Sequence, residues 1–171
     1  VATITEGLNH DISSRVQALG SKIFFISRLP APGLSFGRLP EKIRLRKHFK
    51  YNDIHVLHEC CPHVEWATAF TTRASFFGGT NDVRYRNEQA TSVILRGIDE
   101  NYSAAIPLFD VAEGRSITRY DRLHTRFVAV IGQAVAATLF FNLDPIGRTI
   151  RINGVPFEVI GIFLKDDGLF G

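Results

Sequence analysis

The chain of 171 residues has no methionine, only two cysteines, and no apolar run that could cross a bilayer. A membrane-spanning helix needs about 20 consecutive, mostly apolar residues. The longest apolar stretch, residues 127–143, is interrupted by Gly132, Gln133 and Asn142. We therefore predict no membrane-spanning segment. Because the sequence starts at Val1 and lacks methionine, we expect it to be a piece of a longer protein.

A disulfide framework and a strong net charge are also lacking. Cys60 and Cys61 are adjacent in the sequence. Consecutive Cα atoms lie about 3.8 Å apart, which is closer than an ordinary disulfide requires. The two cysteines therefore leave the redox compartment open. The formal net charge of +3 is too small to predict nucleic acid as a partner.

Sequence motifs of common catalytic and nucleotide-binding loops are missing. Gly78-Gly79 is not followed by the lysine and helix of a P-loop, Gly147 stands before a predicted strand, and no GxSxG sequence occurs. The adjacent acids Asp166 and Asp167 lie in a glycine-flanked tail, where carboxylates are usually solvated. We therefore predict no catalytic residue, no cofactor and no enzymatic activity.

One short segment concentrates potential metal ligands. Within residues 55–63 these are His55, His58, Cys60, Cys61 and His63. Zinc binds histidine and cysteine, and His55 and His58 would share one face of a helix. Structural zinc sites usually join two separated ligand pairs, and no second pair is present. We favour an amphipathic helix with solvated histidines and Cys61 in the core. A soluble metal-binding or enzymatic domain built on this segment is the alternative.

Apolar periodicity predicts a mixture of helices and strands. The predicted helices cover residues 3–19, 53–61, about 100–105 and 133–141, with Asn52 and Thr118 as candidate caps. The predicted strands cover residues 23–26, 64–74, 82–87, 90–96, 127–131, 148–152 and 156–163, with a loop at 29–37 and a turn at Glu113-Gly114. Helices and strands are interleaved and hairpins lie among them, so the predicted fold class is α+β (mixed α/β) rather than doubly wound.

The stretch 127–163 has the clearest pattern. A short apolar run ended by Gly132 predicts a strand buried on both faces, and a helix follows it. Asn153-Gly154 between two alternating runs predicts a hairpin, because both residues tolerate the positive φ of a type I′ turn. We also expect Gly132→Val to disrupt the strand-to-helix junction if that position needs a positive φ or a close backbone approach.

Two features are candidates for partner contacts. The first is a basic stretch that contains Arg38, Lys42, Arg44, Arg46 and Lys47, with Glu41 as the only acid in residues 38–50. Such a stretch can attract anionic lipid headgroups or an acidic partner, although a solvated loop is the favoured explanation. The second is Phe76 and Phe77, for which a buried strand end is favoured over an exposed apolar contact.

Several short motifs occur in a specific order along the chain. They are Leu19-Gly20-Ser21-Lys22 before residues 23–26, Asn52-Asp53-Ile54 leading to Cys61-Pro62-His63-Val64, Gly97-Ile98-Asp99-Glu100-Asn101-Tyr102, Glu113-Gly114-Arg115 before Ile117-Thr118, and the whole of residues 127–163. In this order and spacing they resemble the extracytoplasmic core domain of MacB-type ABC transporter permeases, a family that includes FtsX-like and lipoprotein-releasing permeases.

The resemblance implies a domain with porter and sabre subdomains, inserted between the first two transmembrane helices of a permease. It would lie on the periplasmic, extracytoplasmic side of the inner (plasma) membrane. ATP hydrolysis would occur in a cytoplasmic subunit or domain, and this domain would transmit the motion and dock an adaptor protein, a lipoprotein or another cargo for export. A dimer is implied for the full transporter. A stand-alone scaffold or adhesion module is the second alternative.

The resemblance also suggests a division into three segments. Residues 1–96 would hold the N-terminal helix, the basic loop and the first porter-like half, residues 97–150 a sabre-like insert, and residues 151–171 a return strand and tail. In the family, a further strand and helix complete the porter, whereas this chain ends at Gly171. Either the sequence is a truncated piece or the second half of the porter is missing, and an incomplete porter would leave an open sheet edge.

Overall fold

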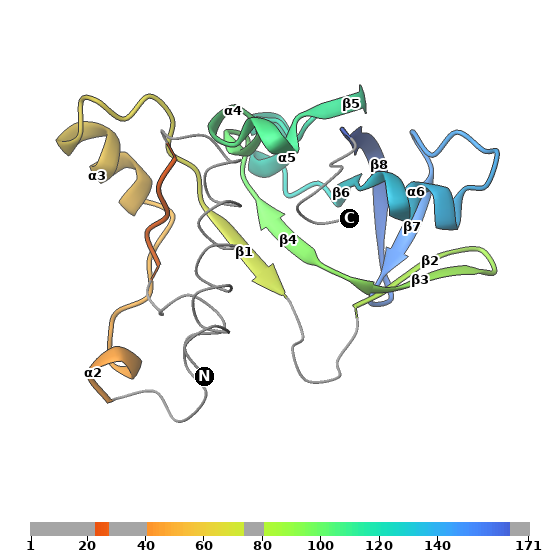
Figure 1. Ribbon diagram of the computed structural model, residues 1–171, viewed down its shortest axis with the longest axis horizontal. Helices are drawn as coiled ribbons and strands as arrows, with labels where there is room; N and C mark the ends of the chain where they lie inside the picture. The colour runs from red at the N-terminus through yellow and green to blue at the C-terminus, as the bar shows by residue number, and fades with distance from the viewer. Residues whose placement is uncertain (1–22, 28–40, 74–80, 165–171) are drawn as a thin grey trace, which may run out of the picture.

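The computed structural model describes residues 23–27, 41–73 and 81–164 (Figure 1). The predicted helix at 3–19, the loop at 29–37 and three partner-contact candidates (Arg38, Phe76 and Phe77) lie outside the described residues. The backbone of Arg44 and His58 is described, but their side chains are not. Within the described residues, no helix has the length and apolar character needed to cross a membrane.

Helices and strands are interleaved along the described chain, which confirms the α+β class. The helices are α2 (Glu41–Arg44), α3 (Asp53–Cys60), α4 (Tyr102–Ala105), η1 (Pro107–Phe109), α5 (Arg119–Leu123) and α6 (Gln133–Leu139). The strands are β1 (Phe70–Arg73), β2 (Asn81–Tyr85), β3 (Glu88–Val93), β4 (Leu95–Ile98), β5 (Val111–Gly114), β6 (Val128–Ile131), β7 (Thr149–Ile152) and β8 (Val155–Phe163).

These strands form two sheets. A six-stranded sheet has the order β3-β2-β7-β8-β5, with β6 pairing in parallel to β8. A two-stranded antiparallel sheet pairs β1 with β4. Only Ile94 separates β3 from β4 in the sequence, so one nearly continuous stretch of chain runs through both sheets (Figure 1).

The strand β8 is the centre of the larger sheet. It pairs antiparallel with β7 through residues 155–158 and with β5 through residues 161–163. It also pairs in parallel with β6 through residues 158–162. The predicted strand, helix and hairpin of residues 127–163 are confirmed as β6, α6 and the β7–β8 hairpin.

The two predicted hairpins differ in how well their residues suit the turn. Asn153 and Gly154 have φ values of 50° and 85°, as the type I′ expectation requires. The β2–β3 hairpin is also confirmed, but the strand predicted at 82–87 ends at Tyr85, and Arg86 and Asn87 form the turn. Arg86 occupies the left-handed region with φ 53°.

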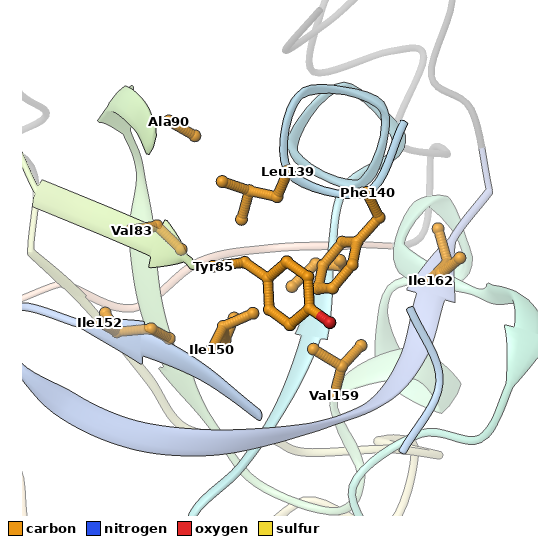
Figure 2. Close-up of a cluster of buried hydrophobic side chains, with 10 residues drawn as sticks. Val83, Tyr85, Ala90, Leu139, Phe140, Ile150, Ile152, Val159 and Ile162 are labelled. Carbon is orange, nitrogen blue, oxygen red and sulfur yellow. The ribbon is translucent and has the colours of Figure 1, made fainter. Parts of the chain in front are cut away.

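The main core lies between α6 and the six-stranded sheet. In Figure 2, Leu139 and Phe140 point from the end of α6 toward Ile150 and Val159, with the ring of Tyr85 between the helix and the strands. Ile150 and Val159 are 0% exposed and Leu139 is 1% exposed. This burial explains why the amphipathic helix is stable although it has only two turns, since tertiary packing supplies most of the stability of short helices.

A second buried region lies beside the β1–β4 sheet. Tyr102 of α4 is 1% exposed, and its ring contacts those of Phe70 and Phe109 with centroids 6.0 and 5.2 Å away. Arg96 donates a hydrogen bond to its hydroxyl over 2.9 Å. Burial raises the pKa of Tyr102 above its ordinary value. This cluster holds α4 and η1 against β4.

Two predicted strands are wrong in whole or in part. Residues 23–27 form no ladder with any described strand, and Phe24 and Ile26 are 66% and 54% exposed. The strand predicted at 64–74 begins only at Phe70, because its partner β4 offers four residues for pairing. An apolar run forms a strand only where a second strand is available to bond its backbone.

Two predicted local signals also failed. Asn52 has helical backbone angles and forms no capping hydrogen bond with its side chain. The Asp53 carboxylate instead accepts a hydrogen bond from the Lys50 amide over 2.8 Å. Gly114 ends β5 rather than forming a turn with Glu113, and its φ of 78° follows a register shift in the pairing with β8.

The structure requires a glycine at position 114 but not at position 132, where the sequence pattern suggested a need for one. Gly132 has an ordinary φ of −72°, and a Cβ placed there meets no atom within 4 Å. The condition for damage by Gly132→Val is therefore not met. A Cβ at Gly114 would instead collide with the carbonyl oxygen of Ile160 and approach Gly161 Cα to 2.9 Å.

We therefore predict that Gly114→Ala lowers the free energy of unfolding by at least about 2 kcal/mol, from backbone collision and a strained positive φ. Gly132→Ala is the matched control and should change it by less than about 0.5 kcal/mol. Urea unfolding of the two variants measures both values. Equal stabilities would show that β5 can move away from β8 at little cost.

Candidate functional site

The histidine-rich segment does not form a metal-binding cluster with the side chains that the structure describes. His55 and Cys60 on α3 are exposed, and His63 beyond its end is also exposed. Among the described side chains, no three histidine, cysteine or acidic groups are placed to hold a metal ion. Cys61 is half-buried and is not in the main core, where the sequence interpretation placed it.

The described part of the basic stretch lies on the surface. Lys42, Arg46 and Lys47 are exposed. Two apolar side chains in the same stretch, Leu45 and Phe49, are 69% and 57% exposed. The stretch therefore combines cations and apolar groups in one solvent-facing segment.

A buried carboxylate organises the most extensive polar network of the described residues. Asp121 on α5 is 2% exposed. Arg115 binds it with two hydrogen bonds, Nη1 to Oδ2 over 2.6 Å and Nη2 to Oδ1 over 3.1 Å. Arg126 donates to Oδ1 over 3.1 Å and also to Glu158 Oε2 over 2.9 Å. Since Arg115 follows β5, Arg126 precedes β6 and Glu158 lies on β8, the network joins three strands of the six-stranded sheet to α5.

The local sequence explains why Asp121 is in this position. Thr118 and Asp121 form a capping box at the start of α5, which confirms the predicted cap. The Thr118 hydroxyl and backbone amide both donate to Asp121 Oδ2, over 2.6 and 3.0 Å. The hydrogen bonds from Arg115 hold the pKa of Asp121 far below its ordinary value, although burial acts in the opposite direction. The same contact raises the pKa of Arg115.

The next residue of α5 binds a different part of the molecule. Arg122 donates from Nε and Nη2 to the two carboxylate oxygens of Glu100, over 2.6 and 2.9 Å. Its guanidinium also lies over the ring of Tyr51, 4.8 Å from the centroid. The hydrogen bonds with Arg122 lower the pKa of Glu100. Glu100 follows β4 and Tyr51 precedes α3, so Arg122 links α5 to the region around the smaller sheet.

Asp121 and Arg122 together make α5 a connection between the two sheets, which we call the α5 clamp. Its members are Arg115, Asp121 and Arg126 on one side and Glu100, Arg122 and Tyr51 on the other. Each charged member is ion-paired, and the second carboxylate that neutralises the two arginines around Asp121 is Glu158, bound to Arg126. The sequence interpretation found Thr118 but missed the clamp, because the arginines that bind Asp121 are identified only by their positions in space.

Known proteins resemble this chain over most of its length. A family model described as the MacB-like periplasmic core domain matches residues 1–171. The macrolide export ATP-binding/permease protein MacB of Neisseria gonorrhoeae is 31% identical over 177 aligned residues, which cover 100% of this chain and 24% of that protein. The chain spans less than a quarter of the length of the curated relatives that it matches.

Two solved structures share the fold. The extracellular domain of the ABC-type transporter YknZ from Gram-positive bacteria has a TM-score of 0.59 and 27% identity, covering 68% of this chain and 58% of that one. The periplasmic region of MacB from Actinobacillus actinomycetemcomitans has a TM-score of 0.60 and 26% identity, covering 75% of this chain and 56% of that one.

The Asp121 network generates a prediction about pH. A lowered carboxyl pKa stabilises the folded chain above the ordinary aspartate pKa, and this contribution is lost as the pH falls toward the folded value. We predict that Asp121→Asn lowers the free energy of unfolding by about 3 kcal/mol at pH 7. The difference between wild type and variant should shrink below about pH 4.

Denaturant unfolding across this pH range tests the prediction, with Asp82→Asn as the control. Asp82 pairs with Arg84 over 2.7 Å at the surface, so its loss should cost less than about 1 kcal/mol. A difference for Asp121→Asn that stays constant down to the acid limit would mean that the ion pairs do not stabilise the fold.

Proposed function

Because the chain belongs to the MacB-like periplasmic core domain family, we propose that it is the extracytoplasmic domain of an ABC transporter permease that transmits ATP-driven motion to a docked adaptor or cargo. The membrane-spanning part of the same permease would anchor the domain on the outer side of the inner (plasma) membrane. ATP hydrolysis would take place in a separate cytoplasmic domain or subunit. In this proposal the chain itself moves and docks but carries out no covalent chemistry.

The observation that supports transmission is the α5 clamp. A domain that transmits motion must have stiff connections between its parts. A bidentate pair of hydrogen bonds between a guanidinium and a carboxylate fixes the orientation of the two groups as well as their distance. Arg115 forms such a pair with Asp121 and Arg122 forms one with Glu100, so the adjacent α5 residues Asp121 and Arg122 bind different parts of the molecule. Displacement of the region around Glu100 and Tyr51 would therefore reach the six-stranded sheet through α5.

The proposed partners follow from the proposal that the chain is a domain of an ABC transporter permease. They are the transmembrane part of the permease, its ATPase, a second copy of the permease in a dimer, and a periplasmic adaptor protein or lipoprotein. The division at residues 96 and 150 into porter-like and sabre-like segments also stays a prediction. Strands from all three predicted segments contribute to the six-stranded sheet, so any such subdomains would share hydrogen bonds.

The first test measures motion directly, in the full-length transporter that contains this chain. A spin label on Cys60, which is exposed at the end of α3, reports the distance between the two copies in a dimer when Cys61 is replaced by serine. We predict that ATP shifts the distribution of this distance. Arg122→Glu should reduce the shift, because two carboxylates would repel each other at the clamp. The exchanged pair Glu100→Arg with Arg122→Glu should restore it.

Unchanged ATP hydrolysis in the same samples serves as the control, because the clamp lies outside the proposed ATPase. The melting temperature of each variant separates loss of coupling from unfolding. An ATP-dependent shift that is the same in Arg122→Glu and wild type would remove the clamp from the mechanism. The absence of any shift in the wild type would contradict transmission altogether.

A second test concerns the side of the membrane. A maleimide that cannot cross membranes should label Cys60 in cells whose inner membrane is intact, since the thiol is exposed and would face the periplasm. Cells carrying Cys60→Ser give the background from Cys61, which is half-buried. Labelling that appears only after the inner membrane is broken would place the domain on the cytoplasmic side and contradict the proposed location.

A further inference from the structure

The exposed segment at residues 42–50 combines a concentrated positive charge with exposed apolar side chains. We propose that it rests on the surface of an anionic phospholipid membrane. The inference depends on the proposed function in one respect, because a domain held beside the inner membrane has such a surface within reach. It adds a lipid contact that fixes how the domain lies on the membrane.

Charge is the first argument. Residues 41–50 contain Lys42, Arg44, Arg46, Lys47 and Lys50 with Glu41 as the only acid. The formal charge of this short segment is 5 − 1 = +4, whereas the whole chain has only +3. The remainder of the chain is therefore close to neutral, and the excess of positive charge is confined to this segment. Clusters of about four to eight lysines and arginines next to a membrane are typical of contacts with anionic lipids.

The apolar side chains are the second argument. Leu45 and Phe49 are 69% and 57% exposed, and both lie between basic residues. Such side chains can enter the boundary between headgroups and acyl chains while the neighbouring cations remain at the headgroups. A free phosphate or an acidic protein surface would use the cations but would leave these two side chains in water. The combination therefore favours a lipid surface over either of them.

The position of the segment is the third argument. Figure 1 shows α2 far from the six-stranded sheet, at an outer end of the molecule. The extensive contacts between elements of the described chain involve the two sheets and the helices that cover them, and none includes α2. Glu41 is the nearest acid on one side of the segment, and Asp53, whose carboxylate accepts a hydrogen bond from the Lys50 amide, is the nearest on the other. The basic side chains at 42, 47 and 50 are exposed to solvent.

Vesicle binding by the chain tests the inference. The chain is mixed with vesicles of phosphatidylcholine alone, or of phosphatidylcholine with phosphatidylglycerol, and the bound fraction is measured after sedimentation. We expect binding only to the anionic vesicles, weakening as salt is added. Each cation near an anionic surface is worth about a fivefold change in affinity. The double variant Lys42→Gln with Lys47→Gln should therefore bind roughly 25-fold more weakly.

Two further variants make the test specific. Arg119→Gln with Arg151→Gln removes the same amount of charge from exposed positions elsewhere, and should change binding by less than about twofold. Leu45→Ser with Phe49→Ser should weaken binding to anionic vesicles while leaving its salt dependence in place, because the cations remain. Melting temperatures verify that all variants are folded.

The inference fails if the chain does not bind anionic vesicles or binds both kinds of vesicle equally. It also fails if the two double variants that remove charge lose the same affinity, since binding would then follow net charge alone. A soluble polyglutamate peptide that binds as tightly as the vesicles, with no effect of Leu45→Ser and Phe49→Ser, would assign the segment to an acidic protein. None of these results affects the labelling and distance measurements, so failure here is distinguishable from failure of the proposed function.

Discussion

The six-stranded sheet and the core beneath it depend on one constraint, the hydrogen bonding of β8 to three other strands. Residues 155–158 pair with β7, residues 161–163 pair with β5, and β6 lies parallel to the middle of the strand. The backbones of β5 and β8 approach so closely that Gly114 and Gly161 leave no room for a Cβ. The apolar side chains of β7 and β8 meet α6 and form the main core. Pairing, glycine placement and core packing are therefore parts of one arrangement.

The α5 clamp depends on this arrangement, because the ends of β5 and β6 bring Arg115 and Arg126 to one carboxylate. A buried carboxylate is costly unless it is paired and hydrogen-bonded. Asp121 meets both conditions, since it accepts hydrogen bonds from two arginines and from Thr118. Replacement of a member would leave charge uncompensated, so the network specifies one orientation of α5. A single orientation is what a domain that passes on movement requires, and it gives the proposed function a physical basis.

The basic residues at 42–50 differ from the arginines of the α5 clamp in their surroundings. Arginines of the clamp are neutralised by acids within the fold, whereas Lys42, Lys47 and Lys50 are exposed in the same segment as Leu45 and Phe49. Paired charges fix internal geometry, and an exposed excess of charge of one sign attracts an external surface of the opposite sign. The molecule thus separates an internally connected body from a segment suited to contact something outside it. The roles that we propose for the charge near α2 and for the clamp on α5 are therefore distinct.

The features that the sequence predicted correctly depend on residues that are close together in the chain. Asn153-Gly154 gave the β7–β8 hairpin, the apolar spacing after Gly132 gave α6, and Thr118 gave the cap of α5, because each depends on neighbours within a few positions. Ordered motifs also identified the family. Tertiary structure alone decided that residues 23–27 pair with none of the described strands, that Gly114 and not Gly132 is the crowded glycine, and that Asp121 meets Arg115 and Arg126. These features depend on which distant segments meet, and local residue preferences contain no information about a partner until the chain has folded around β8.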